Sequence, residues 1–450
     1  MRIPIGKSRG YSFGPGHSQF ELMTTMTDLQ QPSHRRRRHR RTATIAGAAI
    51  LGLAGSAVFL AGDKEAQDVS ARRSLSSSVQ KAEMTTTGHS KSRESLELDL
   101  FDGMNFHDLW MFGRPANIQQ KSSSPDNLHG NQSRRRATTA TADDLPPASH
   151  TNVSYGPYPE NTFDLWLPPS TENAPPSGRP VIIYIHGGGW RVGNKYTLLS
   201  RDAIQPFLDA GIAFASIDYR LTGDLTYALP APIHDAARAV QYIKYHATEY
   251  GLDSSRVALS GFSAGGASVM WLLYHSDLAD PTSDDPIERT SSKVEAGTVF
   301  CGQSSIDPRV IEPWIGHNVV KHNMILNAVG ETDYDEMMKN YDGRYAAIFA
   351  EYSPINHVFS AAKSEDGAPP LFMVYEKWQE LPCQKQGQCI HHGMFGAKMK
   401  ERCDEAAVEC HLVIQDTPQR SLFYDSPAEF LFDKLGVHKK RLSTSGVVKY

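Results

Sequence analysis

Net charge is nearly absent from this chain as a whole. Its 450 residues contain 46 Lys and Arg against 50 Asp and Glu, which gives a formal net charge of −4. A balance this close to zero argues against a polyanionic partner bound through the overall charge. One dense cationic block, residues 35–41, departs from this average. Its composition alone fits nucleic-acid binding or a localisation signal.

Charged residues are also missing from residues 42–62, which follow this block. A helix of that length spans about 31 Å, enough to cross the hydrocarbon core of a membrane. The cations before it and Asp63 after it place the N-terminus in the cytosol. We expect an uncleaved signal anchor, with a cleaved signal peptide as the alternative. Either way, the rest of the chain lies in the secretory lumen or outside the cell, and the arginines need no nucleic-acid partner.

Cysteines are few, and four of the five lie between residues 383 and 410. In an oxidising compartment Cys383 and Cys389 can close a small loop and leave Cys301 free, although the sequence does not fix the pairing. His391 and His392 follow this pair closely, but the spacing matches no usual zinc pattern. We therefore expect no metal.

Apolar periodicity is weak before residue 146. Residues 1–41 and 63–145 are rich in polar residues and are expected to be a disordered cytosolic tail and a disordered stalk. Sequons at Asn131 and Asn152 agree with a glycoprotein whose C-terminal part is lumenal. Residues 146–440 form one expected domain.

Strand and helix patterns alternate within that domain. Strands are expected at 162–167, 181–185, 213–217, 256–260, 297–301, 371–375 and 408–414, and helices at 201–210, 233–250, 264–274, 395–407 and 427–435. This alternation predicts an α/β fold with a mostly parallel central sheet and helices on both faces.

Two motifs follow strand candidates. Residues 261–265 read G-x-S-x-G between a strand and a helix, which presents Ser263 as an exposed nucleophile. The N–H of Ala264 then points at the oxyanion, aided by the helix dipole. Residues 186–190 read His-Gly-Gly-Gly-Trp, and we expect Gly187 and Gly188 to supply further N–H donors. Each motif alone is common, but the pair in this order is typical of the α/β-hydrolase fold.

Residues 150–415 resemble the esterase/lipase branch of the α/β-hydrolase family, the acetyl-esterase and hormone-sensitive-lipase-like group. The likeness is carried by residues 161–168, 186–190, 218–221, 232–240 and 260–266. It implies hydrolysis of carboxylic esters by a Ser–Asp–His triad without a cofactor. Ser263 would be the nucleophile, and Gly187, Gly188 and Ala264 the oxyanion hole.

The resemblance also implies structural roles for other polar residues. We expect Asp218 and Arg220 to form an ion pair behind the site. His234 and Asp235 fit the start of a helix rather than a catalytic role.

The second half of the triad departs from the family pattern. Gln379 occupies the position of the acid, and a neutral amide cannot stabilise an imidazolium as a carboxylate does. Glu380 or Glu376 could substitute, with Glu380 the candidate acid. No histidine follows the last strand, where the family base is expected. Other histidines exist and the base stays unassigned; they are His357, His391, His392 and His411.

Two functions remain open. One is a membrane-anchored serine carboxylesterase-like hydrolase of small or medium acyl esters, and an amidase acting on formamides is its variant. The other is a non-catalytic α/β-hydrolase domain that binds a ligand or a protein. Residues 302–360, together with Trp378, are expected to shape the pocket, but the sequence does not identify the substrate.

Overall fold

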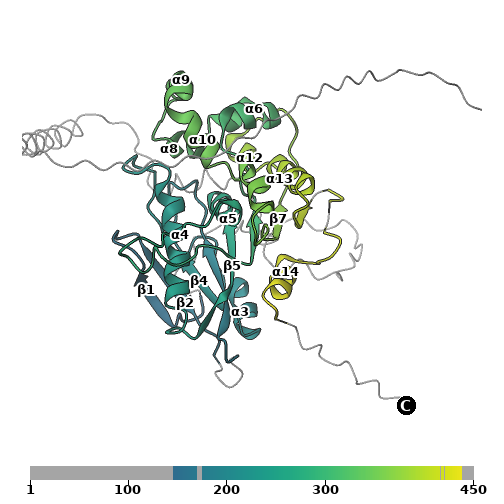
Figure 1. Ribbon diagram of the computed structural model, residues 1–450. Helices are drawn as coiled ribbons and strands as arrows, with labels where there is room; N and C mark the ends of the chain where they lie inside the picture. The colour runs from purple at the N-terminus through teal and green to yellow at the C-terminus, as the bar shows by residue number, and fades with distance from the viewer. Residues whose placement is uncertain (1–144, 170–174, 416, 420, 438–450) are drawn as a thin grey trace, which may run out of the picture. The chain divides into compact units, whose positions relative to one another are not determined.

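The computed structural model describes residues 145–169, 175–415, 417–419 and 421–437. The predicted tail, membrane segment and nearly all of the predicted stalk lie outside these ranges. Within them, no helix is long and apolar enough to cross a membrane. The described residues instead build a domain around one sheet (Figure 1).

The sheet has eight strands in the order β1-β2-β4-β3-β5-β6-β7-β8. The strands are β1 (His150–Ser154), β2 (Thr162–Trp166), β3 (Arg179–Ile185), β4 (Ala213–Ile217), β5 (Leu252–Phe262), β6 (Ala296–Phe300), β7 (Leu371–Tyr375) and β8 (Cys410–Ile414). β2 pairs antiparallel with β1 and β4, whereas every pair from β4 to β8 is parallel. The mostly parallel sheet predicted from the sequence is therefore confirmed.

Burial on both faces explains why the inner strands are continuous apolar runs. All residues of β3, β4, β6 and β7 are buried. Parallel strands are covered by helices on both sides, so they lack the alternation of a half-exposed strand. Continuous apolar runs predict strands at 181–185, 213–217 and 371–375, and each of these runs lies in a strand.

Helices cover both faces of the sheet. They are α3 (Arg201–Asp209), α4 (Ala231–Tyr245), α5 (Ala264–Tyr274), α6 (Pro308–Ile315), α7 (His317–Val320), α8 (Asn323–Ala328), α9 (Tyr334–Lys339), η3 (Tyr341–Tyr345), α10 (Ala346–Glu351), η4 (Pro354–Asn356), α11 (Val358–Ala362), α12 (Gln386–Cys389), α13 (Met394–Glu405) and α14 (Pro427–Lys434). On one face, α3 and α14 meet at Phe207 and Phe432, whose ring centroids lie 5.6 Å apart. On the other face, a Cβ at Gly297 of β6 would lie 2.5 Å from Leu273 of α5.

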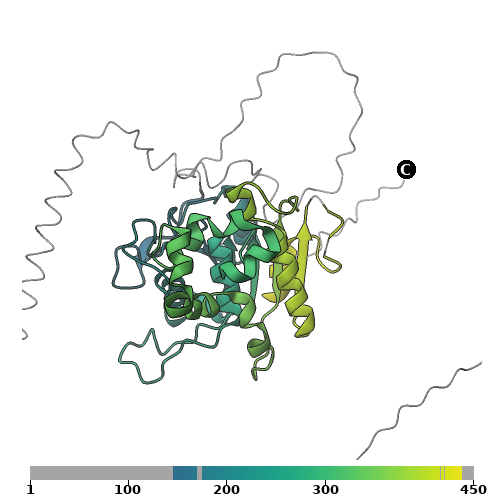
Figure 2. The same cartoon turned by 90° about the horizontal axis from the view of Figure 1, so that it is seen from above.

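A cluster of short helices lies at one end of the sheet. Figures 1 and 2 show the green helices between residues 308 and 362 gathered there. A Cβ at Gly189, just beyond the carboxyl end of β3, would lie 3.3 Å from the Met324 Cβ of α8. The cluster therefore stands over the carboxyl ends of the parallel strands, where ligands bind in open α/β sheets.

Candidate active site

Ser263 occupies a sharp turn between β5 and α5. Its backbone has φ 51° and ψ −120°, in a region that a serine rarely adopts. The Ser263 N–H donates to Phe300 O at 2.8 Å, which ties the turn to β6. The predicted strand–turn–helix geometry around this serine is thus present.

Two glycines let the turn and the glycine loop touch. A Cβ at Gly265 would lie 2.0 Å from Ile185 O, so only glycine allows α5 to pack this closely on β3. Gly188 has φ +107°, and a Cβ there would lie 2.1 Å from Val192 O. The loop that follows β3 is therefore fixed directly beside the serine.

Three backbone N–H groups gather near Ser263. A Cβ at Gly187 would lie 3.3 Å from the Ser263 Cβ, and Ala264 is the first residue of α5. Within the described part of the chain, the N–H groups of Gly187, Gly188 and Ala264 donate to no other group. The first N–H of a helix has no intrahelical acceptor. These are the three residues predicted to form an oxyanion hole, and the fold brings them to the serine.

His391 is the side chain that reaches Ser263. Its Nε2 lies 2.7 Å from the Ser263 Oγ, and its Nδ1 lies 2.9 Å from Gly387 O. A carbonyl oxygen only accepts hydrogen bonds, so Nδ1 carries the proton. In the neutral ring Nε2 is then the acceptor, which is the state needed to take the serine proton.

Burial keeps this histidine neutral. It lowers the pKa of His391 to about 4, while the bond to Gly387 acts in the opposite direction. From the sequence the base stays unassigned, because the family base is expected after the last strand. His391 lies instead between β7 and β8. Its place in a loop at the carboxyl end of a parallel strand was the available signal.

Among the described residues, no carboxylate is hydrogen-bonded to this ring in the place of the triad acid. The Nδ1 of His391, to which an acid would bond, contacts the Gly387 carbonyl. Glu380, the candidate acid, is exposed in the loop that follows β7. Gln379, at the family's acid position, accepts a hydrogen bond through its backbone oxygen from His392 Nε2 at 3.0 Å. The geometry is therefore that of a Ser–His pair oriented by a backbone carbonyl.

The predicted ion pair between Asp218 and Arg220 is wrong. Arg220 instead pairs with Asp235, at 2.5 Å between Nη2 and Oδ1, and Asp218 pairs with Lys195 at 3.2 Å. Asp235 is buried in α4, directly after its first turn, and the Arg220 guanidinium binds both of its carboxylate oxygens. Asp218 and Arg220 both follow the end of β4 at Ile217, but each forms an ion pair with a different residue. Both His234 and Asp235 lie at a helix start, as predicted.

A second histidine lies close to the base. His322 accepts the Met324 N–H through Nδ1 at 3.1 Å and so caps α8. Burial, followed by electrostatic interactions with His391 and Arg191, lowers the pKa of His322 to about 3. The Nε atom of Arg191 is buried without a hydrogen-bond partner in the described structure. The predicted pocket region, 302–360, thus contributes His322 beside the site.

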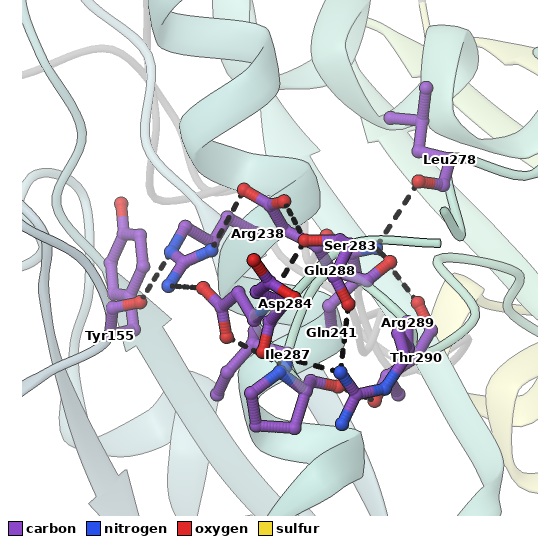
Figure 3. A network of polar contacts seen from close by, with 12 residues as sticks. Tyr155, Arg238, Gln241, Leu278, Ser283, Asp284, Ile287, Glu288, Arg289 and Thr290 are labelled. Carbon is purple, nitrogen blue, oxygen red and sulfur yellow. Dashed lines mark hydrogen bonds and ion pairs between the residues drawn. The ribbon is translucent and has the colours of Figure 1, made fainter. Parts of the chain in front are cut away.

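A separate cavity of about 630 Å³ lies away from this chemistry. Arg238 lines it, donating to Tyr155 O at 3.0 Å and to Asp285 at 2.6 Å (Figure 3). Neither Ser263 nor His391 is among its lining residues. Its two arginines pair with carboxylates in the cavity wall, Arg220 with Asp235 and Arg238 with Asp285.

The cysteine prediction is confirmed. Cys383 and Cys389 form a disulfide, and Cys301 is free and buried. Cys403 and Cys410 are also free.

The parallel sheet, the serine turn and the glycine loop together define an α/β-hydrolase. Residues 163–296 match the model of the BD-FAE family. The chain is 30% identical over 247 residues to a Mycobacterium tuberculosis protein named "Probable carboxylic ester hydrolase LipM", covering 51% of this chain and 48% of that one. It is 39% identical over 89 residues to carboxylesterase NlhH of the same organism, covering 19% of this chain and 26% of NlhH. These similarities support the resemblance to α/β-hydrolase esterases that the sequence motifs indicate.

A solved structure gives a further likeness. The acetyl ester-xyloside bifunctional hydrolase from Caldicellulosiruptor lactoaceticus is 19% identical, with a TM-score of 0.45, over 61% of this chain and 89% of that one. Among the sequence relatives, the chain spans about half the length of LipM and of esterase LipQ from Mycobacterium tuberculosis, 48% of each.

Proposed function

We propose that this protein is a serine hydrolase of small or medium acyl carboxylic esters. The observation that carries the proposal is the 2.7 Å contact between Ser263 Oγ and His391 Nε2. A nucleophile within hydrogen-bond reach of a base that is itself oriented by a third group is the arrangement of nucleophilic catalysis. The ester hydrolases among the relatives support the reaction class.

Each step of ester hydrolysis has a group at this site. Nε2 of His391 takes the Ser263 proton as Oγ attacks the ester carbon. The N–H groups of Gly187, Gly188 and Ala264 bind the negative oxygen of the tetrahedral intermediate. His391 then protonates the leaving alcohol. In the second half of the reaction, water attacks the acyl-enzyme with His391 again acting as the base, which releases the acid and restores Ser263.

The carbonyl in place of an acid at His391 lowers the turnover rate that we expect. During turnover His391 becomes positively charged, and a carbonyl dipole stabilises that charge less than an ionised acid does. We therefore expect a slower enzyme than one with a complete triad, though faster than the oxyanion hole alone.

The test compares the full-length chain with Ser263→Ala on p-nitrophenyl acetate, butyrate and octanoate. We expect the variant to lose at least about 1,000-fold in kcat. Ser260→Ala is the matched control, because Ser260 is also buried on β5 but its hydroxyl has no hydrogen-bond partner in the described structure. Equal rates for wild type and Ser263→Ala would refute the proposal.

A non-catalytic binding domain is the second candidate. The observation that favours it is the carbonyl, rather than a carboxylate, at His391 Nδ1. A fluorophosphonate probe separates the two functions, because it labels only an activated serine. Stoichiometric labelling of wild type, absent in Ser263→Ala, supports the enzyme. Failure of wild type to label supports the binding domain.

We also propose that the protein is a single-pass membrane protein of the secretory pathway or cell surface, with this domain lumenal or extracellular. Residues 35–41 and 42–62 support this location, as does the exposed sequon at Asn152. Carbonate extraction and protease protection of microsomes test it. Release of the chain by carbonate, or digestion of the domain in sealed microsomes, would contradict it.

A further inference from the structure

The orientation of the base depends on a backbone carbonyl. Gly387 O, 2.9 Å from His391 Nδ1, determines which ring nitrogen faces Ser263. In a Ser–His–Asp triad an acid side chain performs this task. The position of the base therefore depends on what holds Gly387.

Gly387 lies inside a loop closed by a disulfide. The bond joins Cys383 to Cys389, six residues apart, and His391 follows two residues later. Between them α12 is a single turn, held by bonds such as Cys389 N to Lys385 O at 2.8 Å. A helix of one turn is not stable in water without other support.

The ends of this loop are anchored to the domain. The Cys383 N–H donates to Ile315 O at 2.8 Å, and Asn318 Nδ2 donates to Cys383 O at 3.1 Å. Beyond the loop, Gln303 Nε2 donates to Ile390 O at 2.7 Å. The disulfide therefore connects the anchored residue Cys383 to the turn that carries Gly387.

We propose that the Cys383–Cys389 disulfide positions the catalytic base. It holds the Gly387 carbonyl against His391 Nδ1, so that the disulfide and this carbonyl together replace the triad acid. This inference rests on the proposed function of Ser263. The two cysteines touch neither substrate nor reacting atoms, so they are positioning residues. Loss of the bond loosens the turn and misdirects the ring, while the groups that bind substrate stay in place.

The test uses the full-length double variant Cys383→Ala/Cys389→Ala. We expect kcat on p-nitrophenyl butyrate to fall about 10- to 100-fold, because small misplacement of a reacting group has effects of this size. We expect KM to stay within about threefold and fluorophosphonate labelling of Ser263 to slow by the same factor as kcat.

The matched control is Cys403→Ala/Cys410→Ala. It removes two buried sulfurs that form no disulfide. It should keep kcat within about threefold of wild type. Unfolding temperatures are measured for both variants, so that all rates are taken on folded protein. A double variant with lower unfolding temperature but wild-type kcat would show that the disulfide only stabilises, and would overturn the proposal.

A second measurement applies if the Cys383→Ala/Cys389→Ala variant does not fold. The Cys403→Ala/Cys410→Ala protein is reduced with dithiothreitol and blocked with iodoacetamide. The S–S bond takes up two electrons and two protons, and dithiothreitol is oxidised to its cyclic disulfide. Kcat should fall in proportion to the fraction alkylated at Cys383 and Cys389, as counted by mass spectrometry. Activity independent of that fraction overturns the proposal. A wild type without Ser263-dependent hydrolysis overturns the proposed function as well.

Discussion

At the scale of single residues, the proposed base is a histidine made weakly basic by its surroundings. Burial lowers the pKa of His391 to about 4, and the Gly387 carbonyl offsets this only in part. A base with so low a pKa takes the serine proton less readily, but it is free to accept a proton over a wider range of pH. The sequence identified Ser263 and its N–H donors because their motif is local. It left His391 as one of four candidate histidines, because His391 becomes close to Ser263 only through the fold.

This environment predicts an unusual acid limb in the pH profile. The pKa is lowered, so His391 stays neutral until the pH approaches about 4, and only the protonated ring is inactive. The kcat/KM of wild type should therefore remain near its plateau at pH 5.5, where a histidine of ordinary pKa is mostly protonated. The measurement is kcat/KM between pH 4 and 8, with His391→Ala as the inactive reference.

Glu380→Gln tests the competing assignment of the acid. Because Gly387 O occupies Nδ1 of His391, the variant should keep kcat within about twofold and leave the pH profile unchanged. A loss of 100-fold or so, the size seen on removing a catalytic donor, would instead make Glu380 the acid.

At the scale of elements, the site is made by the contact of α5 with the end of β3. This contact was predictable because glycine at fixed places is needed wherever two backbones approach. The β7–β8 connection was not predictable in the same way. Its course follows from the Cys383–Cys389 disulfide and from anchors to α6 and α7, and these anchors join residues distant in sequence.

Gly265→Ala should disturb the α5–β3 contact. The new Cβ would lie 2.0 Å from Ile185 O and 2.5 Å from His186 O, and both are backbone atoms that cannot move aside alone. We expect a loss of about 1–3 kcal/mol in the free energy of unfolding, as for other overpacked positions. Kcat should fall more than KM rises, because the serine shifts from the oxyanion donors. Gly343→Ala is the control, since nothing lies within 4 Å of its Cβ position; equal stability of the two variants would contradict the packing argument.

At the scale of the whole domain, neutral histidines are gathered in the interior. Burial lowers the pKa of His391, His322, His186 and His392. The alternation of strands and helices predicted the sheet and its helical covering, because burial on both faces leaves a clear mark on each strand. The gathering of histidines was not visible in the sequence, since they come from separate segments between residues 186 and 392.

These histidines predict a loss of stability on mild acidification. A group whose pKa is lower in the folded state is protonated first in the unfolded state, so stability falls as pH drops below the unfolded value near 6.5. For His391 and His322, with folded pKa values of about 4 and about 3, the loss between pH 6.5 and 5 is about 2 kcal/mol each. Carboxylates with a lowered pKa, such as Asp253 at about 2, change the free energy of unfolding only below about pH 5. Urea unfolding at pH 6.5, 5.8 and 5.0 measures the slope, and His322→Gln should reduce it; a free energy of unfolding that is constant across this range would refute the buried neutral state.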